Sequence, residues 1–152
     1  MSLLVVDTDV VSYIFKDHPL APSFFPLLRG HQLVISFMTR AELRFGARKA
    51  GWGLGRWAAL EAYITRYGIC FPDARMCDLW ADVVLEAAQQ GAPIDSQDAW
   101  VAATALYLNA PLVTNNTKHF QASRNHSISP MPSLIHRAPY PRRQGSLLPK
   151  RP

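Results

Sequence analysis

The sequence predicts an α/β fold in which an open, mainly parallel sheet carries helices on both faces. Three observations favour this class. Short apolar runs of strand composition alternate with segments of helical period along the chain. Helix-length sequence separates successive runs, so neighbouring strands cannot be joined as hairpins and are expected to lie parallel. The chain has 152 residues, which fits one compact domain with a substantial core.

The first element is predicted to be a strand over residues 3–6, a continuous apolar run that ends at Asp7. A helix is expected over residues 10–15, with Asp9 as its N-cap. Residues 21–29 contain two prolines and predict a short or broken helix.

A second strand and helix follow. Residues 32–37 have strand composition, and Thr39 opens a helix that ends near residue 50. The spacing of Thr39 and Glu42 matches a capping box. The glycine-rich loop 51–55 is interpreted as a connector. Its Trp52 has two interpretations: a side chain that stacks on a nucleic acid base, or a surface or dimer-contact residue.

The second half of the chain repeats the alternation. An amphipathic helix begins at Arg56 and ends before Gly68, and residues 69–71 form a short strand candidate. Two further helices and a last strand complete the predicted domain, over residues 74–90, 95–109 and 111–114.

The C-terminal part differs in composition. Six of the twelve prolines lie between residues 130 and 152, which predicts an irregular, Pro- and Arg-rich tail over residues 122–152 after a folded domain over residues 1–121. Residues 99–152 carry seven Lys or Arg and no Asp or Glu. Such sequence suits a polyanion or an acidic partner, and it is equally typical of a solvated basic tail.

Several classes of protein are excluded. Asp7, Asp9 and Lys16 interrupt the most apolar segment, so no membrane span is expected. The N-terminus lacks the basic region and cleavage site of a signal peptide. Cys70 and Cys77 cannot form a disulfide framework and are interpreted as reduced, buried thiols. Together these features predict a cytoplasmic protein.

Polar side chains follow the predicted strands in a way that predicts a site. Asp7 follows the first strand, Glu42 the second, and Asn116 the last, while Asp98 lies in the first turn of the Ala-rich helix. Ligands bind beyond the carboxyl ends of parallel strands, so these four side chains are expected to meet there. A set of oxygen ligands suits Mg²⁺ or Mn²⁺, although each acid taken singly also fits a helix cap.

Four blocks of sequence follow one another along the chain: LLVVDTDVVS from residue 3, ISFMTRAELRFG from residue 35, IDSQDAWVAATA from residue 94 and LVTNNTKHF from residue 112. In this order they resemble the PIN-domain ribonucleases, and within them the VapC-like toxins of bacterial toxin–antitoxin pairs. The resemblance implies a three-layer α/β/α sandwich and a Mg²⁺- or Mn²⁺-dependent endoribonuclease that hydrolyses RNA phosphodiester bonds. It also implies a cognate antitoxin and a homodimer. Asp7, Glu42 and Asp98 fall on the family's metal-binding positions, and Asn116 on its fourth catalytic position.

The chain departs from that family pattern in two places. His119 stands where many relatives carry Asp. Relatives also tend to end soon afterwards with a short apolar strand, whereas this chain is rich in Ser, Pro and Arg from Gln121 onward. These departures leave open a catalytically weak or inactive PIN-like module that binds RNA or a partner. A second alternative is a haloacid-dehalogenase-type phosphatase, with Asp7 as nucleophile and Asp9 as acid and base. That class needs a later acidic pair, and no acid follows Asp98.

An active ribonuclease in the cytoplasm must be inhibited, so a binding surface for the antitoxin is expected. The helices that carry Phe45, Trp52 and Trp57 are expected to form the rim of a groove for an amphipathic or extended antitoxin segment.

Overall fold

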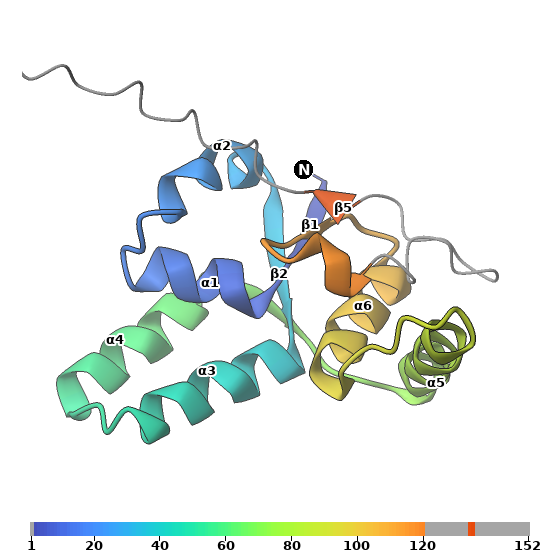
Figure 1. Ribbon diagram of the computed structural model, residues 1–152. Coiled ribbons are helices and arrows are strands. Elements are labelled where there is room, and N and C mark those ends of the chain that lie inside the picture. Colours follow the sequence, from blue (N-terminus) through green and yellow to red (C-terminus); the bar gives the residue numbers. More distant parts are fainter. Residues whose placement is uncertain (1, 121–133, 136–152) are drawn as a thin grey trace, which may run out of the picture.

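A computed structural model describes residues 2–120 and the short strand at residues 134–135. Its centre is a five-stranded sheet in the order β3-β2-β1-β4-β5, and every neighbouring pair is parallel. This confirms the predicted parallel sheet (Figure 1). The strands are β1 (Leu3–Val6), β2 (Gln32–Ser36), β3 (Gly68–Cys70), β4 (Leu112–Val113) and β5 (Leu134–Ile135).

Helices cover both faces of the sheet, so the predicted three-layer α/β/α arrangement is also confirmed (Figure 1). One face carries α1 (Thr8–Phe15), α2 (Phe25–Leu28), α3 (Phe37–Lys49) and α4 (Leu54–Ile64). The other carries α5 (Ala74–Gln89) and α6 (Ser96–Leu108). Two short 3₁₀ turns, η1 (Ala21–Ser23) and η2 (Thr117–Phe120), complete the described elements.

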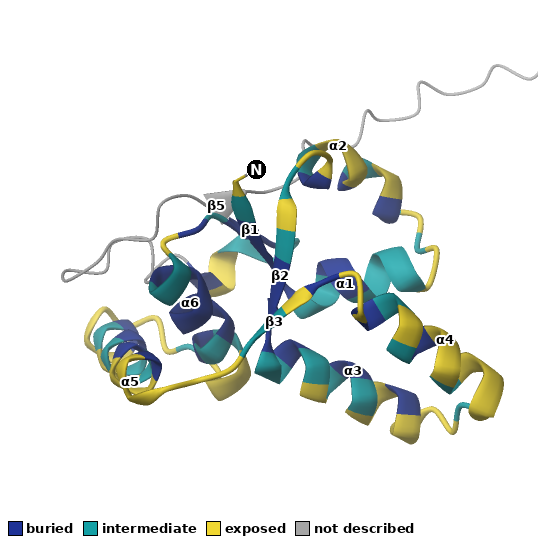
Figure 2. Ribbon diagram, turned by 180° about the vertical axis from the view of Figure 1, so that it is seen from behind, coloured by how far each residue is buried: buried dark blue, intermediate teal, exposed yellow. Residues whose placement is uncertain are grey.

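Successive strand residues point to opposite faces and so contribute to two separate cores. Leu4 and Val6 of β1 belong to the core under α1–α4, whereas Val5 belongs to the core under α5 and α6. Val113 and Leu112 of β4 divide in the same way. The buried residues therefore form one core on each face of the sheet, between the sheet and the helices that cover it (Figure 2).

The helix N-termini correct two predictions about caps. Asp7, not Asp9, is the N-cap of α1, and its carboxylate accepts a hydrogen bond from the backbone N–H of Thr8. Ser36 is the N-cap of α3, so Thr39 and Glu42 do not form a capping box. In both cases the polar residue at the strand end caps the helix directly, because no loop separates the two elements.

The C-terminal region contains one element that the sequence did not predict. Residues Leu134–Ile135 form β5, which pairs with β4, within the segment predicted to be irregular. The remainder of the predicted tail, residues 121–133 and 136–152, lies outside the described residues. Within the described chain, no helix has the length and apolar character needed to cross a bilayer.

The two thiols differ in their surroundings. Cys70 and Cys77 are both free, and Cys70 is half-buried. Cys77 is exposed, so the prediction of two buried thiols is wrong for this residue. It lies on the outer side of α5, whose buried stripe contains Met76, Leu79 and Val83.

Candidate functional site

The carboxyl ends of the central strands surround a pocket of about 560 Å³, here called the acidic pocket. All four residues predicted from the sequence line it: Asp7, Glu42, Asp98 and Asn116. The parallel sheet explains this convergence, because strand ends that are far apart in the sequence meet at one edge. The other lining residues are Thr8, Asp9, Ser12, Asp95, Gln97 and His119.

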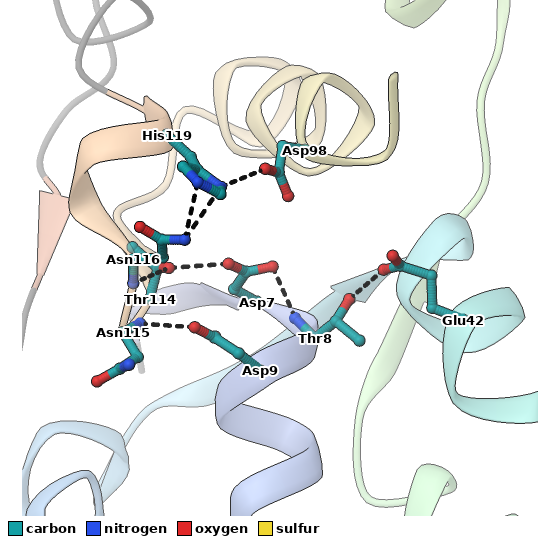
Figure 3. A network of polar contacts seen from close by, with 9 residues as sticks. All are labelled: Asp7, Thr8, Asp9, Glu42, Asp98, Thr114, Asn115, Asn116 and His119. Carbon is teal, nitrogen blue, oxygen red and sulfur yellow. Dashed lines mark hydrogen bonds and ion pairs between the residues drawn. The ribbon is translucent and has the colours of Figure 1, made fainter. Parts of the chain in front are cut away.

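Asp7 lies at the centre of the site and is 5% exposed. One carboxylate oxygen accepts the Thr8 backbone N–H at 2.7 Å, and the other accepts the Thr114 hydroxyl at 2.8 Å. Thr114 in turn accepts the backbone N–H of Asn116 at 3.0 Å. These contacts join the ends of β1 and β4 and fix the orientation of the Asp7 carboxylate (Figure 3).

Glu42 reaches the pocket from the second turn of α3. Its Oε2 accepts the Thr8 hydroxyl at 2.6 Å. Thr8 therefore contacts both acids, Asp7 through its backbone N–H and Glu42 through its side chain (Figure 3). A single residue after β1 orients two of the predicted site residues.

His119 forms hydrogen bonds with both Asp98 and Asn116, the two remaining predicted site residues. Asp98 lies in the first turn of α6, and its Oδ2 accepts His119 Nδ1–H at 2.8 Å. The other ring nitrogen, Nε2, is then free to accept an N–H of the Asn116 side-chain amide at 3.0 Å. His119 thus connects Asp98 and Asn116 at the position where the resemblance leads one to expect Asp (Figure 3).

Asp9 is a site residue that the sequence interpretation missed. Its carboxylate lines the acidic pocket and accepts the backbone N–H groups of Val10 at 2.7 Å and Asn115 at 3.1 Å. The signal was its position two residues after Asp7, where the first turn of a helix brings it back to the strand end. Thr8 and Thr114, which hold the acids, carried no sequence signal of their own.

Burial, more than the crowding of like charges, raises the pKa values of three carboxyls in the acidic pocket. Burial, together with the charges of Asp9 and Asp98, raises the pKa of Asp7 to about 8. Burial also raises the pKa of Asp9 and that of Glu42, despite their hydrogen bonds. The lining includes five acids, and neither Lys nor Arg is among its described residues. The pocket therefore concentrates negative charge, and no Lys or Arg among its described lining residues balances it.

The donor set suits a hard divalent cation, because it consists of carboxylate and amide oxygens. In their present orientations, no three His, Cys, Asp or Glu side chains of the described chain are grouped closely enough to hold one ion. Glu42 is bound to Thr8 and Asp98 to His119, on different sides of Asp7 (Figure 3). The oxygen chemistry and the uncompensated charge fit a metal.

Comparison with known proteins gives a consistent family. The PIN domain family matches residues 4–125 of the chain. Ribonuclease VapC1 of Haemophilus influenzae strain R2866 is 35% identical over 124 residues, which cover 78% of this chain and 90% of that protein. The tRNA(fMet)-specific endonuclease VapC of Shigella flexneri is 27% identical over 121 residues, which cover 80% and 92% of the two chains.

A solved structure agrees with these relatives. The structure of VapBC-1 from nontypeable Haemophilus influenzae contains a chain that is 33% identical to this one and superposes with a TM-score of 0.67. The superposition covers 81% of this chain and 93% of the other. The shared fold therefore includes about four-fifths of this chain.

Proposed function

The chain belongs to the PIN-domain family, and within it to the VapC ribonucleases; from this premise we propose that it is a divalent-metal-dependent endoribonuclease and the toxin of a toxin–antitoxin pair. One observation carries the proposal. Asp7, Glu42, Asp98 and Asn116, which come from four separate segments of the chain, line a single acidic pocket.

Asp7, Glu42 and Asp98 are the residues that would hold Mg²⁺ or Mn²⁺. A divalent ion bound there supplies Lewis acidity toward the phosphoryl group and a water of lowered pKa. The raised pKa values of Asp7 and Glu42 support this assignment. Burial is the main cause of both shifts, the negative charge of Asp98 adds to them, and a shared cation would stabilise the ionised carboxylates against both effects. Asp9 adds negative charge to the same pocket.

The remaining groups orient these acids and the RNA backbone. Thr8 and Thr114 fix the carboxylates of Asp7 and Glu42 by direct hydrogen bonds. His119 holds Asp98 in the same way. The Asn116 amide, at the pocket wall, can donate a hydrogen bond to the attacking water or to a phosphate oxygen.

A cognate antitoxin is the proposed partner, and the site of action is the cytoplasm, where the RNA lies. The predicted contact residues differ in accessibility. Phe45 is 65% exposed, whereas the Trp57 ring is covered by Arg44, whose guanidinium carbon lies 4.9 Å from the ring centroid. A groove of about 260 Å³ between α1, α2 and α4 offers further apolar surface for an amphipathic segment, lined by side chains that include Ile14, Phe25, Leu28 and Tyr63. A homodimer, implied by the family, is part of the proposal.

Incubation of the purified chain with total RNA tests this function. We expect internal cleavage with Mg²⁺ or Mn²⁺ and none with EDTA, and mapping of the new ends identifies the RNA that is cut. The phosphatase alternative predicts instead turnover of a chromogenic phosphomonoester with a phosphoryl adduct on Asp7. RNA that is bound but left intact at every metal concentration would contradict the enzyme and favour an inactive binding module.

A further inference from the structure

A second, smaller cavity of about 90 Å³ adjoins the acidic pocket and is here called the side pocket. The two cavities share Thr8, Ser12 and Glu42 as lining residues. Beyond these, the side pocket continues between α1 and α3 to Trp52, in the loop before α4. A ligand that occupies the acidic pocket can therefore extend into the side pocket and stay in contact with the protein throughout.

Gly46 lines the side pocket from the interior of α3. Glycine inside a helix costs about 1 kcal/mol relative to alanine. Gly46 has no positive φ that would require glycine. A Cβ atom placed there would meet no heavy atom within 4 Å, so no packing contact requires glycine either. Its effect in this structure is to leave the pocket wall without a side chain.

The walls and the rim of the side pocket combine aromatic surface with positive charge. The rings of Phe15 and Trp52 lie with centroids 5.6 Å apart. Lys16 Nζ lies 6.0 Å from the Trp52 centroid, and the Arg56 guanidinium carbon lies 4.1 Å from it. Both cations are exposed, and neither forms an ion pair with another described residue.

This combination matches a nucleotide better than an apolar protein side chain. Aromatic walls accept the face of a base, and nearby cations pair with backbone phosphates. An apolar side chain would pack against the aromatic walls but would supply no negative charge to pair with Lys16 and Arg56. The continuity with the acidic pocket adds to the argument, because consecutive nucleotides of one strand would occupy the two cavities.

Accepting the ribonuclease function proposed above, we propose that the side pocket is a nucleobase subsite. The base of a nucleotide next to the cleaved phosphodiester packs against Phe15 and Trp52, beside Gly46. Lys16 and Arg56 bind the phosphate backbone at the rim. The subsite positions the RNA and gives the enzyme a base preference at one fixed position relative to the cleaved bond.

An abasic scan of a short RNA that the wild-type protein cuts tests the subsite. Each nucleotide near the cut is replaced in turn by an abasic one, and kcat/KM is measured with Mg²⁺. One position is expected to lower kcat/KM of the wild type by about tenfold or more, the scale of a lost base–aromatic contact. Gly46→Leu, which fills the pocket, is expected to lower kcat/KM on the intact RNA to a similar extent and to lose sensitivity at that position.

Gly55→Leu is the matched control. Gly55 is an exposed helical glycine of α4 whose added Cβ would also meet nothing within 4 Å, and it does not line the side pocket. This variant is expected to keep the wild-type rate and the wild-type abasic profile. Anisotropy of a labelled RNA in EDTA, where no cleavage is expected, should show weaker binding for Gly46→Leu and unchanged binding for Gly55→Leu.

The outcomes separate the subsite from the ribonuclease function. If Gly46→Leu cuts the intact and abasic RNAs like the wild type, the base subsite is wrong and the ribonuclease function stands. If that variant keeps RNA cleavage but loses a protein that copurifies with the wild type, the pocket takes a protein side chain instead. If the wild type cuts no RNA with Mg²⁺ or Mn²⁺, the proposed function itself fails, and the subsite with it.

Discussion

The two helical layers of the molecule are built differently. In the layer of α5 and α6, α6 is buried on nearly every side, and four of its seven buried residues are alanine. Alanines allow close approach, so α6 packs tightly between the sheet and α5. In the other layer, α3 and α4 bury single stripes and are exposed on their outer sides (Figure 2). Their exposed residues include arginines and Phe45.

The two layers are therefore expected to have different roles: the α5–α6 layer stabilises the fold around the site, and the α1–α4 layer forms binding surfaces. The α5–α6 layer places Asp98 in the first turn of a helix that is otherwise largely buried. The α1–α4 layer contributes Glu42 and, beside it, the side pocket and the apolar groove. Substitutions in the first layer should therefore act through stability, and those at the pockets through RNA binding and cleavage.

The largest expected effect is at the point where the buried layer meets the acidic pocket. Asp98→Asn is expected to lower kcat/KM for RNA by about a hundredfold or more, because one of three proposed cation ligands is lost. Its melting temperature is expected to rise in EDTA, since Asp98 contributes to the repulsion that raises the pKa values of Asp7 and Glu42.

Asp78→Asn is the control for that substitution, because Asp78 is an exposed acid on the outer side of α5. It should cut RNA and melt like the wild type. Wild-type cleavage by Asp98→Asn would remove Asp98 from the site and would leave the acid with a structural role only.

A smaller effect, on stability alone, distinguishes the two layers. Ala103 of α6 is 0% exposed, and Ala103→Leu is expected to lower the free energy of unfolding by about 1–3 kcal/mol through overpacking. The same change at Ala59, an exposed residue of α4, should alter it by less than about 0.5 kcal/mol. Urea denaturation measures both, and equal losses would contradict the contrast in packing.

The parallel sheet and the convergence of Asp7, Glu42, Asp98 and Asn116 on one pocket could be derived from the sequence for the same reason. Periodicity identified the strands that precede Asp7 and Glu42, and parallel strands bring their ends together. The caps were less predictable, because a capping box at Thr39 and an N-cap at Ser36 are both compatible with the local sequence.

Features that depend on contacts between distant residues could not be predicted. Asp9 accepts the backbone N–H of Asn115, 106 residues away in the sequence. The two-residue strand β5 exists through its pairing with β4. The side pocket beside Gly46 could not be predicted either, because Trp52 and residues of α1 form the rest of its wall. In each case the information lies in tertiary packing.

The central claim is that the crowded carboxylates form a cation site, and proton linkage provides a measurement of it without RNA. The ordinary pKa of the Asp7 carboxyl is 3.8, and in the folded protein it is raised to about 8. Between these values the folded chain holds a proton that the unfolded chain has released. Raising the pH removes that proton and destabilises the fold.

The decisive measurement is therefore the melting temperature against pH, in EDTA and in Mg²⁺, for the wild type and Asp7→Asn. In EDTA the wild type is expected to lose several degrees between about pH 5 and about pH 8. Mg²⁺ should restore most of that loss, because a bound cation takes the place of the proton. Asp7→Asn should show a flatter profile and little response to Mg²⁺. Identical profiles for the two proteins, unchanged by Mg²⁺, would contradict the cation site.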